Sequence, residues 1–315
     1  MKTAVTGAFS YSGKYITKRL LTRGEEVITL TGHPNRPDPF GGKVRAYPLD
    51  FDEAGMRRSL QGVDVLVNTY WVRFDKDENT QPRAVENTRK LVNAAKAAGV
   101  KRMVHISITN PSAESRLPYF WGKAANEKAV TESGMGYAIL RPTVLFGDED
   151  ILINNIAYLL RRVPFFALPG DGSYKLQPVH VEDVAELAVE GIYRTDNYVI
   201  DAVGPDIFTF KQMVQLIGEK LGAKRPLIPV PPRLALLAAQ FISLLVNDVV
   251  LTPEEVDGLM AGLLVSKEPA RGKIRLADWL EKNKNKVGTR YASEIKKHYQ
   301  QSAQSGAKVA VEARS

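Results

Sequence analysis

The chain has 315 residues, 44% of them hydrophobic and 25% charged, which is enough for one large α/β unit with an additional lobe. It contains no cysteine, which excludes disulfides, thiolate catalysis and cysteine-ligated metals. Its four histidines are scattered along the sequence, so we predict no catalytic metal site. No targeting sequence precedes the first predicted strand, and we therefore expect a soluble, cytoplasmic protein.

The formal net charge is +8, and the lysines and arginines are spread along the sequence. A nucleic-acid site needs cations gathered into a patch or an arm, so we predict no nucleic-acid partner. An anionic cofactor, an anionic substrate or an acidic membrane surface would use the same charge. The longest apolar stretch, residues 234–246, is too short to span a bilayer. We expect a buried helix there, with peripheral contact to a membrane surface as the alternative.

The N-terminal sequence predicts a strand, a glycine turn and a helix. A short apolar run ends at Gly7, and a helix with apolar faces begins at Gly13. Because the start of such a helix offers free N–H groups and a positive dipole, we predict a dinucleotide pyrophosphate site. Ser10 stands where a Gly-x-x-Gly-x-x-Gly turn has its middle glycine, and a purely structural turn is the alternative. The candidate contacts are Gly7, Phe9, Ser10, Tyr11, Ser12 and Gly13.

A strand predicted over residues 26–30 completes the first strand–helix–strand unit. An NAD(H) site places an acidic residue near the end of this strand to hold the ribose 2′-hydroxyl, and none stands there. Thr31, His33 and Arg36 follow instead, and these side chains are suited to a 2′-phosphate. We therefore predict NADP(H) as the cofactor, with NAD(H) as the alternative. The structural alternative is that His33 and Arg36 only belong to a proline-rich loop.

Two more strands continue the alternation. Strands over residues 44–49 and 63–68, separated by a short helix over residues 52–60, predict a doubly wound parallel sheet. Asp50 lies just past the first of these strands. Its carboxylate is placed to accept from the adenine amino group or, equally well, to cap the helix that follows.

An aromatic pair, Tyr70 and Trp71, follows the strand at residues 63–68. It stands at the carboxyl edge of the sheet, where open α/β sheets bind their ligands. We expect the two rings to wall the cofactor or substrate crevice, or else to pack as core residues against the second lobe. Asn68 and Thr69 stand at the same edge and are candidate cofactor contacts together with Tyr70.

The next helix and strand bring further polar side chains to the same edge. A helix over residues 81–98 carries Asn87 close to its apolar face. A strand over residues 101–106 follows, and the hydroxyls of Ser107 and Thr109 stand at its carboxyl end. We expect these hydroxyls to reach the crevice.

Tyr119 and Lys123 are the strongest candidates for chemistry. A helix predicted from residue 118 to about 132 places them four residues apart on one face, so that the ammonium can lie near the phenol oxygen. A nearby cation lowers the pKa of a phenol, which suits it to exchange a proton with a carbonyl or an alcohol. The lysine can also hold ribose hydroxyls.

These features resemble the short-chain dehydrogenase/reductase superfamily in its extended or atypical branch, which includes epimerase- and dehydratase-like enzymes. The resemblance covers about residues 1–230 and implies a Rossmann-type doubly wound sheet with a smaller, mainly helical C-terminal lobe. It rests on the turn from Gly7 to Gly13, on Asn87, Ser107, Tyr119 and Lys123, and on the sequence from Tyr137 to Gly147.

The resemblance also implies roles for single residues. Tyr119 would be the acid/base, and Lys123 would lower its pKa and bind ribose. Ser107 or Thr109 would polarise the substrate oxygen, and Asn87 would support a proton relay. Four further residues follow from the same comparison. Pro142, with the arginine before it, would lie near the nicotinamide, and His180 and Asp183 open a recurrent helix, where we favour capping over catalysis.

Two functions fit this resemblance. The first is an NADP(H)-dependent oxidoreductase acting on a small-molecule carbonyl or alcohol, and the apolar helices of the lobe favour a small or hydrophobic compound. The second is a binding module, because similar sequences include the nucleotide-binding accessory subunit of mitochondrial complex I and redox sensors of the nitrogen-metabolite-repressor type. Ser10, the basic charge and the apolar helix expected over residues 234–246 motivate this second function. Extended members often dimerise, which implies a homodimer through residues 81–98 and 119–132.

The remaining sequence predicts the lobe and its boundaries. We expect a helix over residues 151–160, a late strand over 197–203 and a short strand over 227–230, with capping boxes at Thr209 and Thr252 starting two helices. Residues 1–148 and 177–203 would form the dinucleotide-binding domain. Residues 149–176 and 204–300 would form the substrate or partner lobe, and residues 301–315 a mobile tail.

Overall fold

The computed structural model describes residues 1–33, 36–246, 248–249 and 252–293, and the tail predicted at 301–315 lies outside them. The chain divides into two compact units. The first unit comprises residues 1–145, 177–206 and 263–274. The second unit comprises, within the described ranges, residues 146–176, 207–262 and 275–293.

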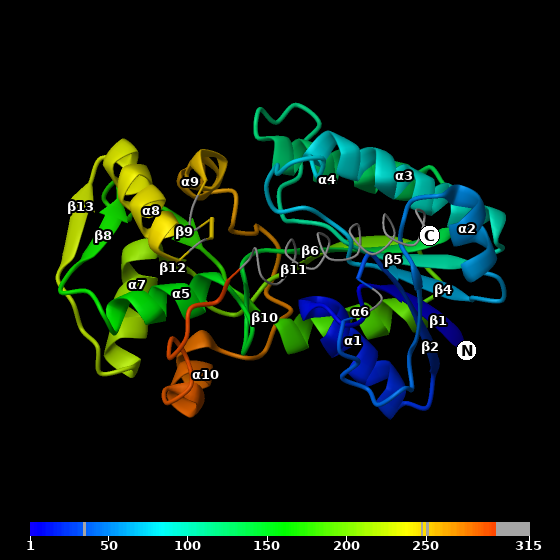
Figure 1. The fold of residues 1–315 in the computed structure, drawn as a ribbon, viewed down its shortest axis with the longest axis horizontal. Coiled ribbons are helices and arrows are strands. Elements are labelled where there is room, and N and C mark those ends of the chain that lie inside the picture. Colours follow the sequence, from blue (N-terminus) through cyan, green and yellow to red (C-terminus); the bar gives the residue numbers. More distant parts are fainter. Residues whose placement is uncertain (34–35, 247, 250–251, 294–315) are drawn as a thin grey trace, which may run out of the picture. The chain divides into compact units, whose positions relative to one another are not determined.

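The first unit is built on a seven-stranded sheet whose neighbouring strands all run parallel (Figure 1). The strand order is β11-β6-β5-β4-β1-β2-β3, which confirms the predicted doubly wound Rossmann-type sheet. The order reverses between β1 and β4, and folds of this kind bind ligands at the carboxyl ends of the strands on either side of that reversal. The strands are β1 (Lys2–Thr6), β2 (Glu26–Thr31), β3 (Arg45–Pro48), β4 (Val65–Asn68), β5 (Arg102–Ile106), β6 (Gly136–Pro142) and β11 (Tyr198–Ala202).

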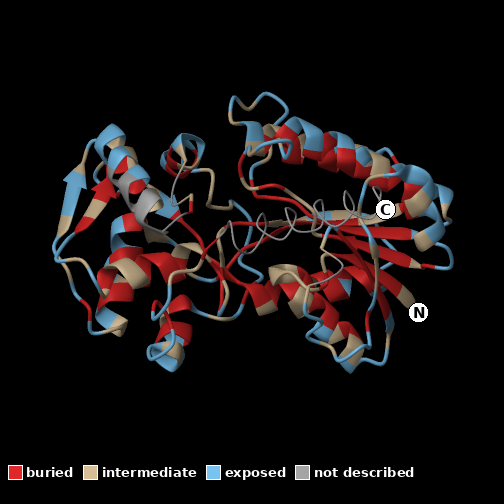
Figure 2. Cartoon of the chain, in the orientation of Figure 1, coloured by how far each residue is buried: buried red, intermediate tan, exposed pale blue. Residues whose placement is uncertain are grey.

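Helices cover both faces of this sheet (Figure 1). Ile16 and Leu20 of α1 pack with Val184 of α6 in one apolar core, and Met56 of α2 packs with Leu91 of α3 in the other. The inner strands β1, β2, β4 and β5 are buried almost throughout (Figure 2), which explains their β-branched and aliphatic sequences. The helices of this unit are α1 (Tyr11–Thr22), α2 (Glu53–Ser59), α3 (Gln81–Ala97), α4 (Pro118–Thr131) and α6 (Val181–Tyr193).

The second unit is mainly helical. Both predicted capping boxes are present, since the side chains of Thr209 and Thr252 accept from backbone N–H groups and each receives a reciprocal bond at its own N–H. Its helices are α5 (Leu152–Leu160), α7 (Phe210–Lys220), α8 (Pro232–Val246), α9 (Pro253–Met260) and α10 (Leu276–Asn283). Its strand pairs are β8 (Phe166–Pro169) with β13 (Leu227–Val230) and β9 (Lys175–Leu176) with β12 (Phe208–Thr209). Two further strands of two residues each, β7 (Leu145–Phe146) and β10 (Val179–His180), lie close in sequence to the boundaries between the units.

Helix α8 differs from the buried helix that the apolar sequence predicts. Leu234 and Leu237 are 54% and 59% exposed, whereas Ala235 and Ala239 are buried. In this turn, then, two large apolar side chains point to solvent while two alanines are buried and Leu236 is half-buried. Among the helices of the described ranges, none combines the length and the apolar character needed to cross a bilayer.

A second difference concerns residues 263–274, which we call the return segment. We expected residues 204–300 to belong to the lobe, but the return segment packs with the first unit. The backbone N–H of Gln177 donates to the carbonyl of Leu264 at 2.9 Å, and that of Gly272 donates to the carbonyl of Val203 at 2.8 Å. These bonds join residues far apart in sequence, which local sequence patterns do not reveal.

Candidate functional site

The turn after β1 has the geometry of an anion site. Gly7 has a φ of +66°, and a Cβ on Gly13 would lie 2.2 Å from the carbonyl oxygen of Gly7, so neither position accepts a side chain without strain. Helix α1 begins at Tyr11 rather than at Gly13 as predicted, because Ser10 is its extended N-cap residue. The Ser10 side chain does not cap the helix, and the first turn contains no acidic residue. The positive end of α1 is therefore suited to a pyrophosphate.

Arg36 reaches this turn from the loop that follows β2. Its Nη1 donates to the hydroxyl of Ser10 at 2.9 Å, and burial lowers the pKa of the guanidinium. Thr31 is buried, and its hydroxyl accepts from the N–H of His33 at 3.0 Å, so it shapes the loop. Of the three residues predicted to hold a 2′-phosphate, Arg36 thus makes a side-chain hydrogen bond to the turn itself.

Phe9 packs against the same loop. Its ring centroid lies 6.3 Å from that of Phe40, and both rings contact the core beneath α1. The carboxylate of Asp38 accepts from the N–H groups of Phe40 at 2.7 Å and Gly42 at 2.6 Å, which closes the loop back on itself. Phe9 therefore has a packing role in addition to the cofactor contact that we predict for it.

Asp50 does not cap α2, which corrects one of its two predicted roles. Asp52 is the N-cap residue, and its carboxylate accepts from the N–H of Gly55 at 2.8 Å. Asp50 accepts instead from the N–H of Asp52 at 3.1 Å in the turn before the helix. Its proposed contact with adenine stays a prediction.

Side chains at the carboxyl ends of β1 and β4 form a buried network. The hydroxyl of Thr6 donates to Oδ1 of Asn68 at 3.1 Å and accepts from the N–H groups of Thr69 at 2.7 Å and Tyr70 at 3.1 Å. Nδ2 of Asn68 lies 3.1 Å from Nδ1 of His105 on β5. Burial and the charge of Lys123 lower the pKa of His105 to about 3, so this imidazole is neutral. Asn68 accordingly links the carboxyl ends of β1, β4 and β5 through hydrogen bonds.

Tyr70 and Asn87 meet as a pair. Nδ2 of Asn87 donates to the Tyr70 hydroxyl at 3.0 Å, and the ring of Tyr70 lies 4.7 Å from that of Phe51. Burial raises the pKa of Tyr70, while the bond from Asn87 partly opposes this. Asn87 was predicted from its family position to support a proton relay, and its contact with Tyr70 was not evident from the sequence.

Trp71 packs against the start of α4. Its ring lies edge-on to that of Tyr119 at 5.8 Å, and Nζ of Lys123 lies 4.9 Å from its centroid. A Cβ on Gly122 would lie 2.5 Å from the Trp71 ring, so the indole fits only over a glycine. Trp71 therefore packs on α4, within the first unit, beside the candidate catalytic pair, and its place in the wall of a cofactor or substrate site stays a prediction.

Lys123 is a buried cation whose partner is the main chain. The side chain is 3% exposed, and Nζ donates to the carbonyl of Ile106 at 2.9 Å. Nζ also lies 5.9 Å from the ring centroid of Tyr119, so the spacing correctly predicts that the two residues share a face. Burial lowers the pKa of Lys123 to about 7, although the charge of Glu127 opposes the shift.

The two candidate hydroxyls after β5 differ in their surroundings. Oγ of Ser107 is buried and has no hydrogen-bond partner among the residues that the structure describes, while its N–H donates to the carbonyl of Leu140 at 2.7 Å. Oγ1 of Thr109 donates to Oδ2 of Asp201 at 2.9 Å. The Ser107 hydroxyl can therefore bind a ligand oxygen without breaking a protein hydrogen bond, whereas the Thr109 hydroxyl cannot.

The Arg141–Pro142 pair lies at the end of β6. Arg141 donates to both carboxylate oxygens of Glu127 on α4, at 2.9 and 2.6 Å, which ties the helix of the candidate pair to the sheet. Pro142 is buried, and its carbonyl accepts from the N–H of Thr109 at 2.9 Å. The position near a nicotinamide stays a prediction for Pro142.

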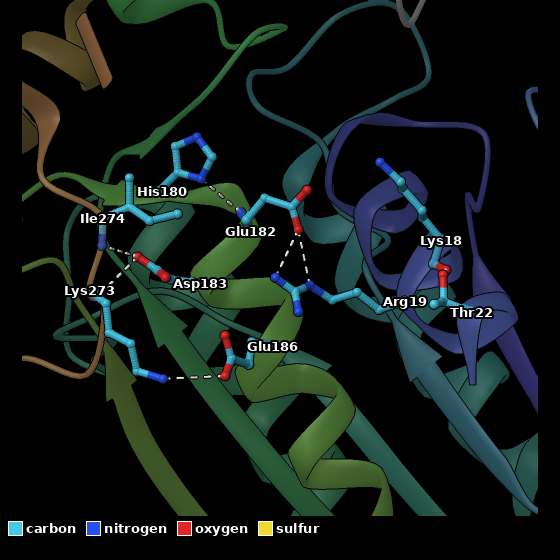
Figure 3. Close-up of polar contacts among 9 residues, drawn as sticks. All are labelled: Lys18, Arg19, Thr22, His180, Glu182, Asp183, Glu186, Lys273 and Ile274. Carbon is cyan, nitrogen blue, oxygen red and sulfur yellow. Dashed lines mark hydrogen bonds and ion pairs between the residues drawn. The ribbon is translucent and has the colours of Figure 1, made fainter. Parts of the chain in front are cut away.

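His180 and Asp183 stabilise the chain around α6 (Figure 3). His180 caps the helix by accepting from the N–H of Glu182 at 3.2 Å. The Asp183 carboxylate accepts from the N–H groups of Lys273 and Ile274, both at 2.9 Å, and thereby anchors the return segment. These contacts support the structural role that we favoured for both residues.

The family model described as NAD(P)H-binding matches residues 7–193. The chain is 26% identical over 232 residues to NADH dehydrogenase (ubiquinone) 1 alpha subcomplex subunit 9, mitochondrial, of Arabidopsis thaliana, and 25% identical over 241 residues to the NADH-ubiquinone oxidoreductase 40 kDa subunit of Neurospora crassa. These matches cover 69% and 73% of this chain but only 57% and 63% of the two relatives. The chain thus spans less than two thirds of these relatives.

Solved structures share the fold. An NADPH-dependent quinone oxidoreductase of Escherichia coli, complexed with NADPH, has a TM-score of 0.70 at 21% identity and covers 92% of this chain and 97% of its own. UDP-glucose 4-epimerase of Thermotoga maritima, with UDP-glucose, has a TM-score of 0.67 at 17% identity and covers 90% and 98%. The turn at Gly7 and the N-terminus of α1 at Ser10 fit the same family. The chain therefore belongs to the NAD(P)H-binding family, in agreement with its resemblance to atypical short-chain dehydrogenases/reductases.

Proposed function

We propose that this chain is an NAD(P)H-dependent oxidoreductase that interconverts a carbonyl compound and an alcohol, with Tyr119 as its acid/base. The observation that carries the proposal is the position of Lys123. Its buried Nζ donates to the carbonyl of Ile106, the residue directly before Ser107, and the buried Ser107 hydroxyl lacks a hydrogen-bond partner in the described part of the chain. A costly buried cation, an unsatisfied hydroxyl and a tyrosine on the same helix face are typical of a catalytic site.

In the proposed reaction the hydride and the proton each have a donor and an acceptor. When bound, the nicotinamide cofactor would supply a hydride to the carbonyl carbon, or accept one in the reverse direction. Tyr119 donates its phenolic proton to the carbonyl oxygen during reduction and takes a proton from the alcohol during oxidation. Ser107 donates a hydrogen bond to the same oxygen, and the charge of Lys123 favours the phenolate form of Tyr119.

The test is turnover of a panel of aldehydes, ketones and quinones with NADPH or NADH. We expect Tyr119→Phe to lower kcat at least about 100-fold while the Kd for the dinucleotide stays within about threefold, because the substitution removes only the proton that is transferred. Tyr47→Phe on the edge strand β3 is the matched control and should keep wild-type turnover. Normal turnover by Tyr119→Phe would remove this residue from the mechanism.

A second candidate is a binding module that holds the dinucleotide without using it, as a subunit of a redox complex or as a sensor. The observation that favours it is the similarity to the two NADH dehydrogenase subunits. It predicts that the purified chain binds NADPH stoichiometrically, consumes none with any compound of the panel, and co-purifies with a partner or with membranes. A partner-free, monodisperse protein that oxidises NADPH with a simple ketone would contradict it.

A further inference from the structure

In the second unit, the segment that follows α10 is held on α5 through its main chain. We call residues 284–293 the strap (orange-red in Figure 1). Two arginines at the end of α5, Arg161 and Arg162, donate to carbonyl groups of the strap. The acceptors are the carbonyls of Lys284 and, at 3.1 Å, Val287 for Arg161, and those of Gly288 at 3.1 Å and Thr289 at 2.9 Å for Arg162.

Two asparagines of α5 continue this pattern. Nδ2 of Asn155 donates to the carbonyl of Ala292 at 3.1 Å, and Oδ1 accepts from the N–H of the same residue at 2.8 Å. Oδ1 of Asn154 accepts from the N–H of Gly288 at 3.4 Å. These bonds, like those of the two arginines, go to main-chain atoms, so they do not select the side chains of the strap. We call the four side chains that make them the strap-binding surface.

One position of the strap accepts only glycine. Gly288 has a φ of +70°, and a Cβ there would lie 2.5 Å from the carbonyl carbon of Ala157 and 2.6 Å from the backbone nitrogen of Tyr158. The atoms in the way belong to the main chain of α5, which cannot move aside at low cost. A segment on this surface therefore needs a glycine turn at this point.

The strap covers little apolar surface. Val287 is 3% exposed, and the half-buried Tyr291 lies edge-on to Tyr158 with 5.6 Å between the ring centroids. The side chains of residues 284–286, 289 and 290 are exposed. Release of the strap would mainly uncover asparagine and arginine side chains, which water can satisfy. We therefore expect the strap to open at a lower free energy than the rest of the protein.

The charge of the strap does not match that of its surface. The strap contains three basic residues and no acidic one, and its main chain is bonded to Arg161 and Arg162. The basic residues are Lys284, which pairs with Glu281 of α10 at 2.6 Å, Lys286 and Arg290. A segment with the same main-chain course and acidic side chains would keep the hydrogen bonds and replace repulsion by attraction.

We propose that the strap-binding surface of α5 is a docking site for an acidic peptide segment with a glycine turn, presented by a partner protein. The strap occupies this surface until such a segment displaces it. The main-chain bonds supply affinity for any sequence with the right turn, and the two arginines select acidic side chains. The inference does not depend on the dinucleotide site or on turnover.

The probe is a fluorescent decapeptide with the sequence of residues 284–293 and the substitutions Lys284→Glu, Lys286→Glu and Arg290→Glu. Titrated against the full chain up to about 1 mM and followed by anisotropy, it should bind at least about tenfold more tightly than the peptide of unchanged sequence, and more weakly as salt is added. Gly288→Ala in the acidic peptide should weaken binding at least about tenfold. Thr289→Ala is the matched peptide control, because this exposed hydroxyl donates within the strap, to the carbonyl of Lys286.

Variants of the full chain locate the binding site. Gly288→Ala loosens the strap and leaves the surface intact, so this variant should bind the acidic peptide at least about fivefold more tightly than the wild type. In the Gly288→Ala background, where the strap no longer competes, Arg162→Met should weaken binding at least about fivefold, because it removes two donors. Arg89→Met at an exposed position of α3 is the matched control and should leave the affinity unchanged.

Two results would overturn the inference. One is the absence of saturable binding to both the wild type and Gly288→Ala, and the other is an affinity that Arg162→Met does not change in that background. If Gly288→Ala does not fold, hydrogen exchange of the wild type decides. Saturating acidic peptide should then speed exchange at the amides of Gly288 and Ala292, whereas unchanged exchange there would contradict displacement of the strap.

Discussion

At the scale of single residues, Lys123 links stability to pH. Burial lowers its pKa from 10.5 to about 7, so between these values the unfolded chain holds a proton that the folded chain lacks. Stability therefore rises with pH across this window, and the full cost of the buried charge is present below pH 7. We expect Lys123→Met to be more stable than the wild type at pH 6, and this advantage to shrink by about 3 kcal/mol at pH 9.5, measured by urea unfolding.

Lys128→Met on the same helix is the control, because the Lys128 side chain is exposed and forms a surface ion pair with Glu132 at 3.8 Å. Its effect should be nearly independent of pH. A Lys123→Met advantage that stays constant from pH 6 to 9.5 would show that the ammonium is not destabilised in the folded protein.

At the scale of elements, the contact between α4 and the chain after β4 depends on Gly122. Ala in the middle of a helix normally adds about 1 kcal/mol of stability over Gly. Here the added methyl would lie 2.5 Å from the Trp71 ring, so we expect Gly122→Ala to destabilise the protein by about 1–3 kcal/mol, measured by thermal or urea unfolding.

The double variant Gly122→Ala with Trp71→Leu separates the two effects. With the indole gone, the alanine should no longer cost stability relative to Trp71→Leu alone, and helix propensity should make it neutral or stabilising. An alanine that destabilises both backgrounds equally would place the strain elsewhere in α4.

At the scale of the whole molecule, the return segment is held on α6 mainly through Asp183. Its carboxylate receives two backbone N–H groups, whereas Lys273 pairs with the partly exposed Glu186 at 3.3 Å (Figure 3). We expect Asp183→Ala to lower stability by about 1–3 kcal/mol, because two N–H groups lose their acceptor. Hydrogen exchange at the amides of Lys273 and Ile274 should rise in the same variant.

Glu186→Ala is the matched control, since it removes only a surface ion pair with Lys273. It should change stability by less than about 1 kcal/mol and leave amide exchange in the return segment near the wild-type rate. Equal effects of the two substitutions would assign the anchoring to the ion pair and not to the buried carboxylate.

Local patterns predicted the elements because their causes are local. Alternating apolar runs and glycine stops identified the strands and helices of the sheet, and Thr209 and Thr252 marked two helix starts through bonds spanning three residues. The sequence analysis offered Asp50 as the helix cap, whereas Asp52 is the cap, and both carboxylates precede the same helix. The exposed side of α8 was missed because composition reports apolar character and not which side chains find a covering partner.

By itself, the sequence determined the doubly wound sheet, the glycine turn and the shared face of Tyr119 and Lys123, since each follows from periodicity or short spacing. Only the tertiary structure decided which partners the polar groups take. The bond of Lys123 to the Ile106 carbonyl and the bond of Arg36 to Ser10 join residues 17 and 26 positions apart. Such pairs depend on how strands and loops meet at one edge of the sheet, which no short stretch of sequence encodes.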